Sequence, residues 1–199
     1  MVTMRAQAHT LEAFVAGLLV LSGIVFALQT TAVTPLSAST SNQHVGNQQR
    51  TAALGVLDAA EANGTLRDAL VDWNASEGTF TNASGGGYRN GGPPNAFGHA
   101  LNRTFREQRT AFNVDLYWTD VNDSNAGPKP LVDMGTPSDD ATVASRNVVL
   151  YDDTRLAGSP NTTVAEARAN ASTTFYAPDA AVGQRLFNVV EVRITVWRI

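Results

Sequence analysis

The chain has 199 residues, a net charge of −4 and no cysteine. This length suits one membrane segment followed by a domain of about 150 residues, which is large enough to bury a core without disulfide bonds. The absence of cysteine excludes disulfides and cysteine-ligated metals. Acidic residues outnumber basic ones by 18 to 14. We therefore expect no binding to nucleic acid, which requires a basic face.

The most apolar stretch lies near the N-terminus, within residues 7–34. Residues 13–28 carry no charge, and Ser22 is their one polar side chain. With the residues that follow, the stretch reaches the length of about 20 that a spanning helix needs. Arg5 precedes it and the next basic residue is Arg50. The positive-inside rule therefore predicts a single span in the cell membrane, with the N-terminus in the cytoplasm and the rest of the chain outside.

Three interpretations of this stretch are open. A secretory signal would be cleaved near the small residues Thr30, Thr31 and Ala32. An uncleaved anchor would keep the whole segment in the membrane. The third interpretation depends on the eight residues in front of the uncharged core.

Those eight residues read RAQAHTLE. They resemble the class III signal of archaeal type IV pilins and pilin-like proteins, and the resemblance covers about residues 5–33. In that family a basic and a small residue precede the cut, a Gln often follows it, and a Glu stands near the start of the apolar helix. The resemblance implies that a prepilin-type peptidase cuts between Ala6 and Gln7, which makes residues 1–6 a leader, or after Gln7, which makes Glu12 the fifth mature residue.

The resemblance also implies a role for Glu12. A carboxylate at the rim of an apolar helix is costly in lipid unless it is paired. In pilin-like filaments it pairs with the free amine of a neighbouring subunit, so the helix over 7–34 is retained and becomes the assembly core. The alternative is a carboxylate held at the level of the lipid headgroups.

The following part, residues 35–75, is expected to form a neck and a helical stalk. Pro35 should end or kink the first helix. Helical periodicity returns from Asn47 and stops at the Asn63-Gly64 pair, and a second helix is predicted over 65–73.

The remainder of the chain predicts an α+β fold. Residues 76–94 have the composition of a Gly-rich linker, and 95–199 are expected to form an α+β extracellular domain. Its predicted elements are a helix over 95–109 capped by Asn95, a short helix over 164–169, a short strand over 173–176, and longer strands over 112–119, 143–151 and 187–199. A helix followed by a small antiparallel sheet is also the layout of many type IV pilin-like subunits.

The chain contains seven N-x-[S/T] sequons, where its composition would give about two or three by chance. All follow the apolar stretch, on the side that the charges place outside. Asn102 falls within a predicted helix and is the poorest acceptor, whereas Asn82 and Asn122 fall in predicted loops and are the best. An Asn- and Thr-rich surface would produce sequons by composition alone, which is the alternative to a glycoprotein. The glycosylation candidates are Asn63, Asn74, Asn82, Asn122, Asn161 and Asn170.

No catalytic motif is found, and no cofactor or metal site is expected. The aromatic residues Tyr88, Trp118 and Trp197 are expected to pack in the core or on a sheet face rather than to form a binding patch. The sequence thus favours a non-enzymatic, pilin-like cell-surface subunit, whose partners are the membrane, copies of itself or other pilin-like subunits. The alternative is a monomeric single-span surface protein whose extracellular domain binds a ligand.

Overall fold

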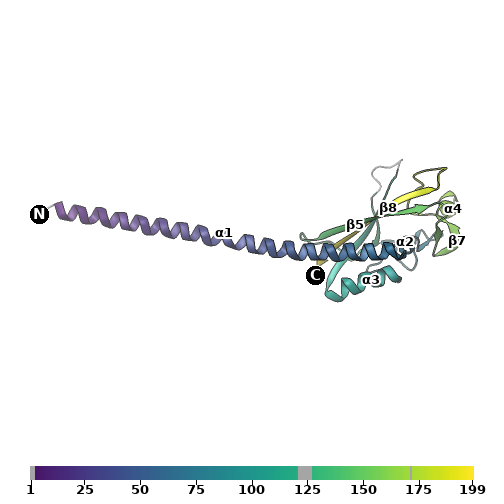
Figure 1. Ribbon diagram of the computed structural model, residues 1–199, viewed down its shortest axis with the longest axis horizontal. Helices are drawn as coiled ribbons and strands as arrows, with labels where there is room; N and C mark the ends of the chain where they lie inside the picture. Colours follow the sequence, from purple (N-terminus) through teal and green to yellow (C-terminus); the bar gives the residue numbers. More distant parts are fainter. Residues whose placement is uncertain (1–2, 121–126, 171) are drawn as a thin grey trace. The chain divides into compact units, whose positions relative to one another are not determined.

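The computed structural model describes residues 3–120, 127–170 and 172–199, without the side chains of residues 3–10 and 29–42. It is an α+β fold with an N-terminal apolar helix, further helices and a four-stranded antiparallel sheet (Figure 1). The fold class predicted from the sequence is therefore confirmed. The chain divides into two units, Met1–Val45 and Gly46–Ile199.

Helix α1 spans Thr3–Ala62. It does not end at Pro35, so the expected end there is wrong and the expected neck is helical backbone, whereas a kink at Pro35 stays a prediction. A proline removes one N–H from the helical ladder, while the turns before and after it keep their own hydrogen bonds. The helix ends where the sequence predicts, because Gly64 has φ of 82°, a left-handed conformation that glycine adopts without steric cost.

The second unit is built on four antiparallel strands in the order β4-β3-β8-β5. They are β3 (Thr110–Trp118), β4 (Lys129–Val132), β5 (Thr142–Tyr151) and β8 (Leu186–Arg198). The alternating patterns of β3, β5 and β8 predict these strands correctly. Strand β4 is not among the predicted strands. It contains Pro130 and is an edge strand, where a missing N–H leaves the ladder intact.

One face of the sheet forms the core. The last turns of α1 pack there, as Ala53, Leu57 and Ala60 recur at i, i+4 and i+7 and are buried with the sheet residues in one cluster. Helices α2 (Thr65–Leu70) and α3 (Ala96–Thr104) add further side chains to the same cluster. The fully buried side chains from these helices and from β3 and β8 include Leu66, Leu70, Phe97, Leu101, Val114, Leu116, Val190, Val192 and Ile194.

Local sequence signals fix the ends of the smaller helices. Asn95 caps α3, and its side chain accepts a hydrogen bond from the Gly98 N–H at 3.0 Å. The 3-10 helix η1 (Arg106–Gln108) follows α3. Helix α4 (Val164–Ala169) coincides with the predicted short helix and begins with a capping box between Thr163 and Glu166.

The segment 76–94 differs from the expected linker, because it is packed into the second unit. It holds strand β2 (Thr79–Phe80), which pairs with β1 (Trp73–Asn74). Phe80 is 1% exposed, with its ring centroid 5.0 Å from that of Trp73. The backbone N–H of Tyr88 donates to Leu131 at 2.9 Å. Aromatic residues within the Gly-rich composition supply the burial that a linker lacks.

Two further expectations are corrected near Trp73. The second helix ends at Leu70 rather than at 73, and residues 173–176 do not form a strand. Thr174 instead donates its N–H to Ala75 at 2.9 Å, and its carbonyl accepts from the Trp73 indole N–H at 2.6 Å. These contacts give the segment hydrogen bonds in place of a ladder. A separate pair of short strands, β6 (Arg155–Leu156) and β7 (Ser159–Thr163), precedes α4.

Candidate functional site

The apolar segment is Leu11–Leu28, which is long and apolar enough to cross a membrane and has none of its residues buried within the chain. Its large side chains are exposed, among them Phe14 and Phe26 at 70% and 69%. A helix whose apolar side chains find no cover in its own chain needs lipid or a protein partner around it. These features fit a single membrane span or a signal sequence.

The three residues that the sequence assigns to processing and assembly all lie in α1. Ala6 and Gln7 are near its start, with side chains outside the described part of the chain. Glu12 is exposed and is the second residue of the apolar segment. The helical backbone is therefore continuous from the predicted processing site into the predicted span.

The predicted glycosylation sites differ in exposure. Asn63, Asn82, Asn161 and Asn170 are exposed, whereas Asn74 and Asn102 are half-buried. Asn122 lies outside the described residues. Since an N-linked glycan is bulky and needs a surface position, exposure separates four favourable acceptors from two poorer ones.

Several of these asparagines also hold a turn. The Oδ1 atoms of Asn63, Asn74 and Asn170 accept the N–H of the residue two positions later, at 3.1, 3.2 and 2.9 Å. Such Asx turns are a common use of asparagine. Asn102 in α3 instead accepts the Gly92 N–H at 2.9 Å, which ties the Gly-rich segment to the helix and makes Asn102 a structural residue.

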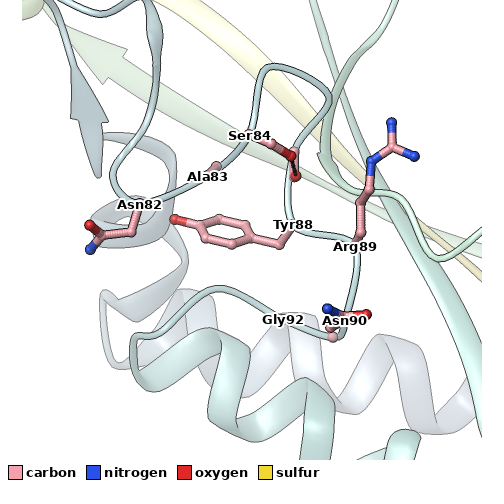
Figure 2. A pocket seen from close by; sticks show the side chains of 9 residues that line it. Asn82, Ala83, Ser84, Tyr88, Arg89, Asn90 and Gly92 are labelled. Atoms are coloured by element: carbon pink, nitrogen blue, oxygen red, sulfur yellow. Dashed lines mark hydrogen bonds between the residues drawn. The ribbon is translucent and has the colours of Figure 1, made fainter.

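The Gly-rich segment forms a hollow of about 380 Å³ around Tyr88 (Figure 2). The Tyr88 hydroxyl donates to the Thr81 carbonyl at 2.5 Å and points toward Asn82, while Arg89 points away from the ring. Burial, and then the nearby Asp72 carboxylate, raise the pKa of Tyr88 to about 12. Tyr88 is therefore a protonated donor that holds the loop at neutral pH. The contacts of Tyr88 with Thr81 and Leu131 could not be predicted, because residues 76–94 have the composition of a linker.

The sheet face opposite the core is polar. Arg193 lies over the ring of Tyr117, with the guanidinium carbon 4.1 Å from the ring centroid, and its Nη2 atom is 3.2 Å from Glu191. Burial and then the Asp133 carboxylate raise the pKa of Asp115, while Arg193 lowers it. Arg193 and Tyr117 on this face thus pair with each other. Trp118 instead belongs to the core side of the sheet, where it packs against Tyr176 with ring centroids 5.6 Å apart.

No group of three or more His, Asp and Glu side chains within residues 3–120, 127–170 and 172–199 could hold a metal ion.

A further tyrosine joins two segments of the second unit. The half-buried tyrosine Tyr176 donates its hydroxyl to the Leu70 carbonyl at 3.2 Å, and burial raises its pKa. Its role is accordingly to join the loop before β8 to the end of α2.

Comparison with known proteins gives one match. A family described as "Family of unknown function (DUF7288)" matches residues 5–196. No curated protein and no solved structure matches the chain. The match runs from the residues in front of the apolar segment to the end of the last strand.

Proposed function

Because the chain belongs to this family of unknown function (DUF7288), we propose its function from its own residues: it is a non-enzymatic, membrane-anchored, pilin-like cell-surface subunit. In this proposal the apolar part of α1 is retained and packs against copies of itself or of other pilin-like subunits. The second unit, Gly46–Ile199, is displayed outside the cell.

The observation that carries the proposal is the exposed apolar segment Leu11–Leu28, with Glu12 at its start. An apolar helix in lipid associates through close packing and polar contacts. A carboxylate at the rim of such a helix favours association with a neighbour that offers a positive charge, and a processed subunit has a free amine close by in sequence. The resemblance of residues 5–33 to a class III signal supports the same assignment.

The layout of the second unit supports the proposal as well. The last turns of α1 belong to the core of an antiparallel sheet, with Leu57 fully buried. One helix therefore supplies both the apolar segment and part of the domain core. An N-terminal helix followed by a small antiparallel sheet is also the layout of many type IV pilin-like subunits.

The first test is the N-terminus of the protein isolated from membranes, measured by mass spectrometry. A mature chain that begins at Gln7 or at Ala8 supports processing by a prepilin-type peptidase. An intact Met1, or a terminus near Val33, removes the pilin-like assignment. An intact Met1 would indicate a plain uncleaved anchor, and a terminus near Val33 would indicate a cleaved secretory signal.

The second test is assembly. Cells are sheared, and the released fraction is examined for filaments that contain the protein. We expect Glu12→Gln to lose most of the filaments while the protein still inserts in the membrane, because the substitution removes the charge and keeps the size of the side chain. Glu107→Gln is the matched control, since Glu107 is exposed on η1. Full release of filaments by Glu12→Gln would contradict the role of Glu12. Protein that stays with the membrane as a monomer would favour a single-span surface protein.

A further inference from the structure

A hollow of about 540 Å³ lies where α1 gives way to α2, beside strand β5. Its volume is in the range of about 300 to 1,000 Å³ that is usual for small-molecule sites. The turn between the two helices and the start of α2 form one wall, and β5 forms the other. The polar or aromatic side chains that line the two walls are Glu61, Asn63, Arg67, Asn147 and Tyr151.

Strand β5 is an edge of the four-stranded sheet. It pairs with β8 on one side, and no other strand of the described chain pairs with it. Every second backbone N–H and C=O of β5 therefore points away from the sheet. An uncovered edge of this kind is a template for pairing with another chain, and natural proteins protect such edges.

The last turns of helix α1 reach strand β5 through side-chain ion pairs. Arg146 of β5 forms ion pairs with Asp58 and Glu61 of α1, the second with Nε and Oε2 3.1 Å apart. The helix then ends at Ala62, and the left-handed Gly64 turns the chain into α2. The next residues of β5, Asn147 to Val149, border the hollow, and the end of α1 and the start of α2 border it from the other side.

Asn63 stands at the rim of the hollow with its amide in a fixed orientation. Its Oδ1 atom accepts the Thr65 N–H at 3.1 Å and the Thr65 hydroxyl at 2.6 Å. A backbone N–H can only donate, so the atom that faces Thr65 is the oxygen. The nitrogen Nδ2 lies on the other side of the planar amide, and it has no hydrogen-bond partner among the residues that the structure describes. Asn63 is also exposed and begins an N-x-T sequon.

We propose that a glycan linked to Asn63 occupies this hollow and covers the free edge of β5. The inference rests on the proposed function, because glycosylation of this kind requires display of the domain outside the cell. Glu61, Arg67 and Asn147 can form hydrogen bonds with sugar hydroxyls. The Tyr151 ring is 40% exposed, with the Arg185 guanidinium carbon 5.5 Å from its centroid, and its exposed surface can contact a sugar ring.

The attachment takes its sugar from a glycosyl phosphate donor through the transferase of the host. A bond forms between Asn63 Nδ2 and the anomeric carbon of the sugar. The bond from that carbon to the phosphate oxygen breaks, so the phosphate leaves with the electron pair. Nδ2 loses one proton in the step, and the leaving phosphate takes it up.

The test compares the full chain from its native host with the variant Asn63→Asp. Aspartate keeps an oxygen that accepts from Thr65, so the turn is preserved, but it cannot carry the glycan. We expect the wild-type peptide that contains Asn63 to carry a glycan mass. We also expect Asn63→Asp to lose hydrogen-exchange protection at residues 147–149 of β5, with no change in α3.

Two controls separate the glycan from the substitution. Both chains are also produced in a host without N-glycosylation, where residues 147–149 should exchange at the same rate in the two proteins. A difference that persists there would come from the new charge and would overturn the inference. The second control is Asn161→Asp, which removes an exposed sequon on β7 and should leave β5 unchanged.

The outcomes distinguish the inference from the function on which it rests. An unmodified Asn63 in a chain with a glycan at Asn161 overturns the inference and leaves display outside the cell intact. A glycan at Asn63 with no effect on residues 147–149 overturns its place in the hollow. A chain with an intact Met1 and no glycan at either site removes both proposals.

Discussion

Truncation of Leu57 tests the packing of the last turns of α1 on the sheet. Leu57 is 0% exposed and belongs to the core cluster, whereas Leu54, one turn earlier, is half-buried at the edge of the same cluster. A fully buried leucine replaced by alanine costs about 2 to 5 kcal/mol, because apolar contact is lost and a cavity remains. Leu57→Ala should therefore lower the free energy of unfolding by this amount, and Leu54→Ala by clearly less.

For a unit of this size, each kcal/mol lowers the melting temperature by about 2 to 4 °C, so Leu57→Ala should lower it by roughly 4 to 20 °C. The assay is denaturant or thermal unfolding of the full chain in detergent, followed by tryptophan fluorescence. Trp73, Trp118 and Trp197 all belong to the second unit, so the signal reports on the domain and not on the apolar segment. Equal effects of the two substitutions, or a loss below about 1 kcal/mol for Leu57→Ala, would refute the described packing.

Two other predictions follow from backbone space and from charge. Gly98→Ala places a methyl group against the Pro93 carbonyl oxygen and should destabilise the domain by about 1 to 3 kcal/mol or more, whereas Gly55→Ala meets no atom within 4 Å in α1 and should stabilise it by about 0.5 to 1 kcal/mol. Equal melting temperatures of the two variants would contradict this. The raised pKa of Asp115 means that the folded state disfavours its ionised form, so stability is lost as the pH rises through the folded pKa. Asp115→Asn should therefore melt at a higher temperature than wild type at pH 7, and this gain should disappear below the unfolded pKa of about 3.9. A gain that does not change between pH 3 and pH 7 would assign it to another cause.

Elements with a strong local pattern were predictable. The alternation in β3 and β8 follows from one buried face, and Asn95 and Gly64 mark helix ends through their own side chain or lack of one. The helix does not end at Pro35, because a proline removes one hydrogen bond of the helix while the neighbouring turns keep theirs. Tyr88 was assigned to a linker because its partners, Leu131 and Thr81, lie in segments whose pairing no local pattern indicates.

The predicted sites show the same division. The sequons, and the Arg-Ala-Gln residues that precede Glu12, can be recognised in the sequence, because each is a short motif. Their surroundings cannot be read from the sequence, because one wall of the hollow beside Asn63 is formed by Asn147 to Tyr151 of β5, far along the chain. Asn102 illustrates the converse, since its contact with Gly92 gives it a structural role that its sequon does not indicate.

The sequence by itself determined the apolar stretch and the α+β class, and it supplied the predicted orientation and the candidate acceptors, because each depends on composition or on a short period. Only the tertiary structure decided that 76–94 is part of the domain, that β5 is an edge strand and that Leu57 is buried more deeply than Leu54. These depend on which distant segments meet. The free energy that stabilises these contacts comes from burial and strand pairing between residues far apart in the chain, and no local sequence pattern indicates which residues these are.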